Sequence, residues 1–139
     1  GYGSLPKYLE PYAHAWQNVL PHTAFALLKG WEAASGGGCS WFDLKAWDGC
    51  TLLSQHKACV QPLKMASARA VDQVEALTHS LKLSHGSVAL MGFSQGAMMA
   101  LQMGLSFTKP CAGVVACAGA LLAREEDVTS KPHILLVHG

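Results

Sequence analysis

The chain has 139 residues, of which 50% are hydrophobic and 14% are charged, and its formal net charge is +1. An average globular domain has about 25% charged residues, so this composition favours an α/β domain whose parallel strands are buried on both faces. No basic run points to nucleic acid, and the longest apolar run, 111–123, is too short and too rich in Gly and Ala for a membrane span. We expect one domain over residues 1–139, with no stable membrane insertion and a cytoplasmic location.

Cysteine and histidine placement bears on redox and metal chemistry. The five cysteines form no C-x-x-C pair, and none has a Cys/His spacing typical of zinc. The odd count and the apolar setting of Cys111 and Cys117 favour reduced, buried thiols. No two of the seven histidines lie four residues apart with an acidic neighbour, as in H-E-x-x-H, so we predict no metal site.

The first 60 residues mix a helical pattern with loops. Apolar residues recur at helical spacing at Leu5, Tyr8, Leu9, Tyr12, Trp16, Val19 and Leu20, which predicts a helix with its aromatics on a core face. Thr23–Leu28 then reads as a buried strand, and 29–40 reads as a glycine-rich loop that lacks the Lys-Ser/Thr ending of a phosphate loop. The stretch from Trp47 to Gln61 is polar and poorly periodic.

From residue 63 to residue 83 the pattern predicts a long amphipathic helix. Its apolar stripe is Ala70, Val71, Val74, Leu77 and Leu81. Further along, apolar runs predict strands at 88–93, 111–118 and 133–139, the first two separated by a helix that is apolar almost all round. Strands alternating with helices indicate a parallel, doubly wound sheet.

The most informative stretch is Gly92-Phe93-Ser94-Gln95-Gly96, between the 88–93 strand and the apolar helix. This is the G-x-S-x-G nucleophile-elbow pattern, in which a serine sits on a sharp strand-to-helix turn. We expect Gly92 and Gly96 to keep the space beside the turn free, and the helix N-terminus to favour a developing oxyanion. By chance the bare pentapeptide occurs in roughly one chain in twenty of this size, but the flanking strand and helix favour the catalytic interpretation over a glycine-rich turn.

Several pieces together resemble one family. Gly1-Tyr2-Gly3-Ser4 is similar to the end of an H-G-x-G turn, followed by Trp41-Phe42-Asp43, by Gly92-Phe93-Ser94-Gln95-Gly96-Ala97 and by Leu135-Leu136-Val137-His138-Gly139. In this order and spacing they resemble the phospholipase/carboxylesterase family, relatives of acyl-protein thioesterases with the α/β-hydrolase fold. The resemblance implies a mostly parallel sheet with helices on both faces.

The same resemblance implies hydrolysis of small carboxylic esters or thioesters by a Ser-Asp-His triad, without a metal or an organic cofactor. By position, Ser94 would be the nucleophile, and the backbone amides of Tyr2 and Gln95 would be the oxyanion donors. Trp41 and Phe42 would lie near the acyl-binding surface. Cys39 stands near a position where relatives often carry an arginine. The sequence leaves open whether the protein forms a homodimer.

The family's order also implies that residues 1–139 are an internal fragment, truncated at both ends. The catalytic Asp and His would lie beyond Gly139, and the strand that ends at the H-G before Gly1 would lie between 88–93 and 23–28. The fragment alone is then expected to be inactive. An internal triad of Asp127 with His133 or His138 fits the order Ser, acid, His but not the fold.

Two other interpretations remain. A non-catalytic α/β-hydrolase-fold binding protein would keep the scaffold but lack triad members. A dienelactone-hydrolase-like enzyme would share the fold, but its elbow nucleophile is a cysteine, whereas this elbow carries Ser94.

Overall fold

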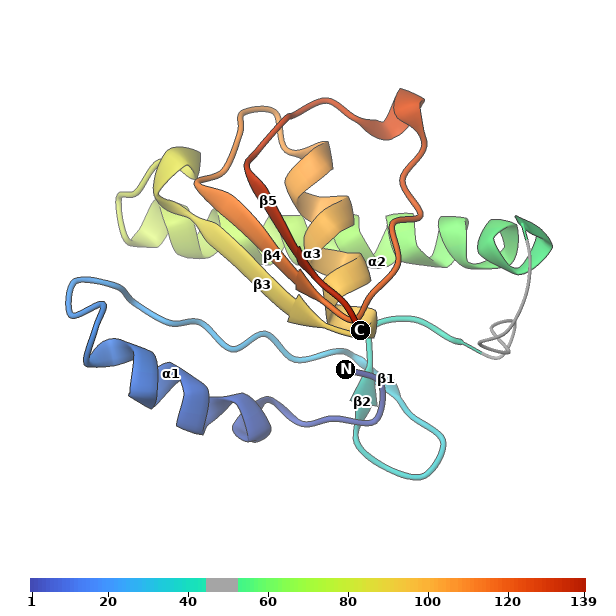
Figure 1. Ribbon diagram of the computed structural model, residues 1–139, viewed down its shortest axis with the longest axis horizontal. Helices are drawn as coiled ribbons and strands as arrows, with labels where there is room; N and C mark the ends of the chain where they lie inside the picture. The colour runs from blue at the N-terminus through green and yellow to red at the C-terminus, as the bar shows by residue number, and fades with distance from the viewer. Residues whose placement is uncertain (45–52) are drawn as a thin grey trace.

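A computed structural model describes residues 1–44 and 53–139 (Figure 1). Its centre is a three-stranded parallel sheet in the order β3 (Ala89–Phe93), β4 (Gly113–Cys117) and β5 (Ile134–Val137). Thus the strands predicted at 88–93, 111–118 and 133–139 are confirmed, each slightly shorter than its apolar run. All three strands end at one edge of the sheet, and both chain termini lie beside that edge (Figure 1).

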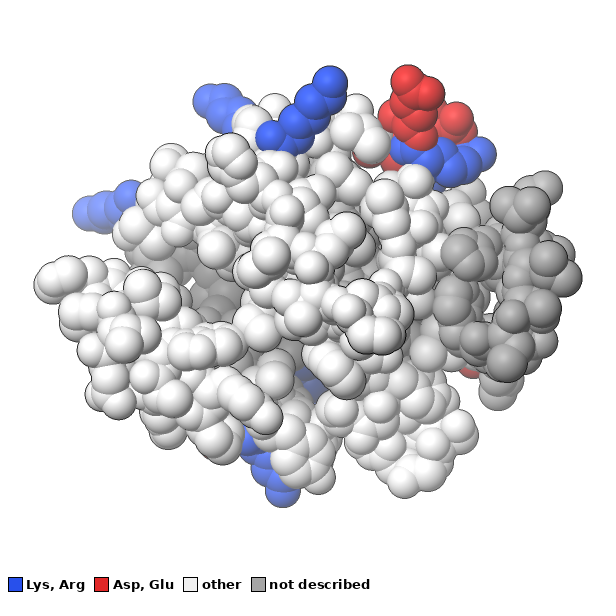
Figure 2. Space-filling view, viewed as in Figure 1, with Lys and Arg blue, Asp and Glu red and all other residues white. Residues whose placement is uncertain are grey.

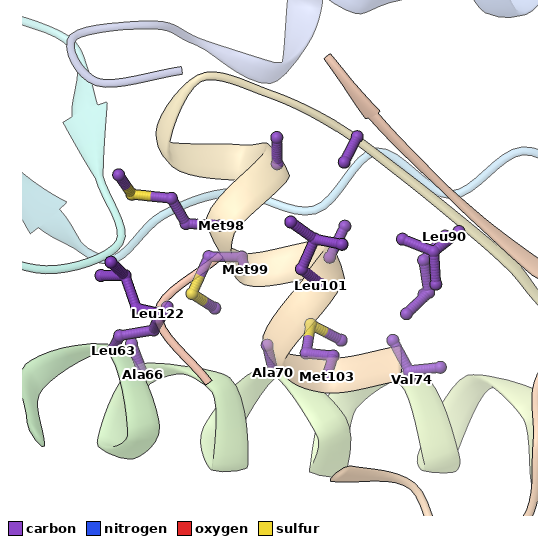
Figure 3. Packing of buried hydrophobic residues seen from close by; sticks show 14 of the residues in the cluster. Leu63, Ala66, Ala70, Val74, Leu90, Met98, Met99, Leu101, Met103 and Leu122 are labelled. Atoms are coloured by element: carbon purple, nitrogen blue, oxygen red, sulfur yellow. The ribbon is translucent and has the colours of Figure 1, made fainter. Parts of the chain in front are cut away.

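Helix α3 (Gln95–Ser106) packs on one face of β3 and β4, and α2 (Leu53–Ser80) packs across the far side of α3. Because α3 lies between the sheet and α2, ten of its twelve residues are buried, as its nearly all-round apolar sequence predicts. The core forms where its Met98, Met99, Leu101 and Met103 meet Leu63, Ala66, Ala70 and Val74 of α2 (Figure 3).

The long helix differs from its prediction in both its start and its face. It begins at Leu53, inside the stretch predicted to be irregular. Leu77 is 40% exposed and Leu81 is also exposed, while Thr78 is buried and donates a hydrogen bond to the carbonyl of Val74. The hydroxyl of Thr78 is satisfied inside its own helix, so a polar residue occupies the buried row that the apolar pattern assigned to leucine.

The first 30 residues depart most from expectation. Only a short 3₁₀ turn (Pro6–Leu9) and α1 (Glu10–Gln17) form, and no residue of either element is buried. The predicted core face is therefore wrong: Tyr8 and Tyr12 are more than half exposed, and the ring of Trp16 lies tilted against the rings of Tyr12 and Phe25.

The strand predicted at 23–28 is also absent. These residues have no strand partner among the described residues, and β1 (Glu32–Ala33) and β2 (Cys39–Ser40) form a small hairpin in the region predicted as a loop. A strand needs a neighbouring strand to satisfy its amides, so apolar composition alone does not form one. Trp47 and Cys50 lie outside the described residues.

The sheet face opposite α3 is not covered by a helix in the described parts of the chain. In register across it lie Met91, Val115 and Leu135, then Phe93, Cys117 and Val137. Figure 2 shows this side with the charged side chains at its rim. No helix of the described residues is long and apolar enough to cross a bilayer.

Candidate active site

Ser94 occupies the sharp turn between β3 and α3. Its φ of 53° and ψ of −118° lie in a region that non-glycine residues rarely adopt. Its amide donates to the carbonyl of Cys117 at 2.8 Å, while its own carbonyl accepts from the amides of Ala97 and Met98. The sheet holds the turn on one side and the helix on the other, so the strained backbone is fixed by its surroundings, as is common for catalytic residues.

Close packing at the elbow depends on Gly92 and Gly119. A Cβ on Gly92 would fall within 2.5 Å of the amide nitrogen of Ala97, and one on Gly119 would lie 2.9 Å from the carbonyl oxygen of Ser94. Gly96 is different, because a Cβ there would meet nothing within 4 Å among the described residues. The space-keeping role predicted for both motif glycines is therefore correct for Gly92 and wrong for Gly96.

The N-terminal turn lies against the nucleophile. A Cβ on Gly1 would be 3.6 Å from Cβ of Ser94, so the following residue, Tyr2, starts beside the elbow. Two backbone hydrogen bonds fix this turn to the hairpin: the amide of Gly3 donates to Cys39 at 2.9 Å, and the amide of Cys39 donates to Ser4 at 3.2 Å. The backbone of Cys39 thus anchors the loop, whatever side chain stands there.

A side-chain bond adds to this attachment. The hydroxyl of Tyr2 lies 2.9 Å from Oγ of Ser35 and accepts a hydrogen bond from the Ser35 amide at 3.1 Å. The aromatic ring therefore ties the N-terminal turn to the tip of the β1–β2 hairpin.

The side chain of Gln95 connects the elbow to residues 41 and 42. Its Oε1 accepts from the amide of Trp41 at 3.0 Å, and its Nε2 donates to the carbonyl of Phe42 at 2.7 Å. Sequence inspection assigned only the backbone amide of this residue. Its side-chain contacts span more than 50 positions, so no local pattern could have indicated them.

The two predicted substrate-binding aromatics have different surroundings. Trp41 is half-buried and meets Trp31 edge to face with ring centroids 5.3 Å apart, and the guanidinium of Arg69 covers the Trp31 ring at 4.4 Å. Phe42 is 3% exposed and belongs to the hydrophobic core. A contact of either side chain with substrate stays a prediction, and Trp41 is the more accessible of the two.

The in-chain candidates for acid and base are not brought to Ser94. Asp127 forms ion pairs with Lys64 and Arg124, and the hydrogen bond from Lys64 lowers the pKa of its carboxyl group. His133 precedes β5, at the opposite edge of the sheet, about 16 Å along the strands from the elbow. His138 follows β5 at the same edge as Ser94, but two strands away, about 10 Å.

Metal ligands and thiols give no further candidate. The described residues contain no group of three or more His, Cys, Asp or Glu side chains that could hold a metal. Cys39, Cys59, Cys111 and Cys117 are free thiols, and burial raises the pKa of Cys59 and Cys111. Cys117 is half-buried, so the prediction of a buried thiol is correct for Cys111 only.

A cavity of about 440 Å³ lies beside the hairpin, lined among others by Trp31, Cys39 and Arg69. Ser94 does not line it. We therefore assign the candidate site from the elbow geometry rather than from this hollow.

Comparison with known proteins shows the family and the fold of this chain. The profile of the family described as Phospholipase/Carboxylesterase matches residues 1–139. The crystal structure of esterase PE8 superposes with a TM-score of 0.89 at 29% identity, covering 99% of this chain and 64% of that chain. A variant of SOBER1 from Arabidopsis thaliana superposes at 0.66 with 21% identity, covering 99% and 70%, which shows a shared fold. No curated protein matches the sequence.

Proposed function

This chain belongs to the phospholipase/carboxylesterase family, and we propose that the whole protein that contains it acts as a serine hydrolase, which cleaves carboxylic esters or thioesters through an acyl-enzyme on Ser94. The observation that carries the proposal is the backbone of Ser94, held at φ 53° at the start of α3 with the Gly1–Ser4 turn beside it. The chain spans about two thirds of the length of esterase PE8, so this activity is proposed for the whole protein.

In the proposed reaction, Oγ of Ser94 attacks the acyl carbonyl carbon, and a base takes its proton. The carbonyl oxygen becomes an oxyanion, which the backbone amides of Gln95 and Tyr2 stabilise together with the N-terminal end of α3. The alcohol or thiol leaves with a proton, and water then releases the acid from the acyl-enzyme.

We place the acid and the base outside residues 1–139. The positions of Asp127, His133 and His138 support this, because the first is engaged by two cations and the others lie across the sheet. No described histidine makes a hydrogen bond to Ser94. The family resemblance supplies the expectation of a later Asp and His.

The test is hydrolysis of a short p-nitrophenyl ester and of an acyl thioester by the full-length protein. We expect Ser94→Ala to lower activity by on the order of a millionfold, because the nucleophile is lost. Ser87→Ala, at an exposed serine before β3, is the matched control and should keep full activity. A folded Ser94→Ala protein that retains more than a few per cent of the rate would refute the assignment.

A non-catalytic binding protein would give a different result. It would hydrolyse neither substrate, and a fluorophosphonate probe would fail to label Ser94, because the probe also needs an activated serine. The ratio of kcat/KM for the ester and the thioester decides which leaving group the protein prefers.

A further inference from the structure

The two amides proposed to form the oxyanion hole belong to segments far apart in the sequence. Gln95 begins α3, whereas Tyr2 lies in the N-terminal turn, which is held by backbone hydrogen bonds to Cys39. The Gln95 side chain bonds to Trp41 and Phe42, which follow Cys39 within three residues. One short segment, 39–42, is therefore hydrogen-bonded both to the turn that carries Tyr2 and to the side chain of Gln95.

We propose that the side-chain carboxamide of Gln95 is a positioning residue that sets the distance between the two oxyanion donors. This inference rests on the proposed function and adds to it a role for a side chain that does not touch the reacting atoms. The connection runs from the elbow through the carboxamide to 41–42, and from there along the chain to Cys39 and the N-terminal turn.

The chemistry of the carboxamide fits this role. At 1% exposure its polar atoms cannot use solvent, and each has one backbone partner of the right kind: an N–H for Oε1 and a C=O for Nε2. The bonds are therefore satisfied in one orientation only, which fixes the position of the 41–42 backbone relative to α3.

Loss of this connection should affect the transition state more than the substrate complex. The oxyanion exists only after attack, and a displacement of about 1 Å in a catalytic arrangement can cost on the order of a hundredfold in rate. We therefore expect Gln95→Met, which has similar size but no hydrogen bonds, to lower kcat about 10- to 100-fold with little change in KM.

The matched control is Gln102→Met, on the same helix and 4% exposed. Rates are normalised to the sites titrated by a fluorophosphonate, so unfolded protein does not count. The second measurement is inhibition by an alkyl boronic acid and by a trifluoromethyl ketone, which form tetrahedral adducts with the serine. Their affinity should fall in parallel with kcat/KM in Gln95→Met and stay unchanged in Gln102→Met.

Gln95→Glu supplies a readout that a purely structural role would not change. When protonated, its carboxyl group can donate to Phe42 and accept from Trp41, as the carboxamide does, but when ionised it faces a carbonyl without a donor. The activity of Gln95→Glu relative to the unsubstituted protein should therefore rise as the pH falls.

The inference is overturned if Gln95→Met matches Gln102→Met in kcat and in inhibitor affinity, or if the relative activity of Gln95→Glu does not depend on pH. These outcomes leave the proposed function intact as long as Ser94→Ala is inactive. If Ser94→Ala retains activity, the proposed function is refuted, and the positioning role of Gln95, which rests on it, is overturned as well.

Discussion

The amide of Ser94 donates a 2.8 Å hydrogen bond to the carbonyl of Cys117, so the pairing of β3 with β4 continues one residue beyond the strand and into the elbow. The pairing of β4 with β5 also continues one residue beyond β4, because the amide of Ala118 donates to the carbonyl of Val137 of β5 at 2.8 Å. The sheet edge is thus hydrogen-bonded across all three strands where the nucleophile emerges. This explains how a residue with positive φ can be held in one position.

The two glycines of the motif should respond differently to alanine. A methyl group on Gly92 would collide with backbone at Ala97, which cannot turn aside as a flexible side chain can. We expect Gly92→Ala to lower the free energy of unfolding by about 1–3 kcal/mol or more. Gly96→Ala meets open space inside a helix, so it should be neutral or stabilising by up to about 1 kcal/mol.

Urea unfolding of both variants checks this prediction, with activity measured separately. Equal losses of stability in Gly92→Ala and Gly96→Ala would show that the strand and the helix do not approach closest at Gly92.

The register of α2 can be tested with two leucines. Leu63 is 1% exposed in the core with α3, whereas Leu77 is 40% exposed, although the apolar pattern placed Leu77 on the buried stripe. Leu63→Ala should cost about 2–5 kcal/mol, since it leaves a cavity. Leu77→Ala should cost no more than about 0.5 kcal/mol. Thermal melts compare the two, and a larger loss for Leu77→Ala would mean that the helix is rotated.

Asp127 should make stability depend on acid pH. Its pKa is lowered in the folded protein, chiefly by Lys64, so it binds protons less readily folded than unfolded. The contribution of Asp127 to the free energy of unfolding is therefore fully present above the ordinary aspartate pKa of about 3.9. It is lost as the pH falls through the lower pKa that Asp127 has in the folded protein. Asp127→Asn should be less stable than the unsubstituted protein at pH 7, by up to about 1 kcal/mol, and this difference should shrink below about pH 4.

Urea melts at pH 7 and at pH 3.5 measure this difference, and Asp72→Asn, an exposed carboxylate on α2, serves as the control. A stability difference for Asp127→Asn that is the same at both values would show that the ion pair with Lys64 does not contribute.

Removal of the Tyr2 hydroxyl should lower kcat, although it should change stability little. Tyr2→Phe removes the contacts with Ser35 but keeps the backbone hydrogen bonds of the turn, so the loss of stability should be about 1 kcal/mol or less. Because the turn carries a proposed oxyanion donor, we expect kcat to fall about two- to tenfold with KM unchanged. Tyr12→Phe, at a 58% exposed tyrosine of α1, is the control. Identical kinetics for Tyr2→Phe and Tyr12→Phe would show that the bond to Ser35 at the hairpin tip does not position the proposed oxyanion donor.

Local patterns were sufficient for the part of this protein whose structure is decided locally. The apolar run before Gly92 and the apolar helix after Ser94 predicted β3, the elbow and α3, because strand, turn and helix are contiguous there. The same stretch, with the Gly1–Ser4 and 41–43 pieces, identified the family that the whole-chain comparison confirms. The alternation of strands and helices predicted the parallel direction of the strands, which the pairing of β3, β4 and β5 confirms.

Tertiary structure decided what depends on distant partners. The run 23–28 has the composition of a strand but no paired neighbour among the described residues, and the aromatics of 5–20 have helical spacing but no surface to pack on. Gly92 and Gly96 look equivalent in the motif, yet an added Cβ would meet backbone at Gly92 and nothing within 4 Å at Gly96 among the described residues. The side-chain bonds of Gln95 cross more than 50 residues. Composition and spacing indicate which secondary structure a segment favours. Its burial and its hydrogen-bond partners depend on which distant segments pack against it in the fold.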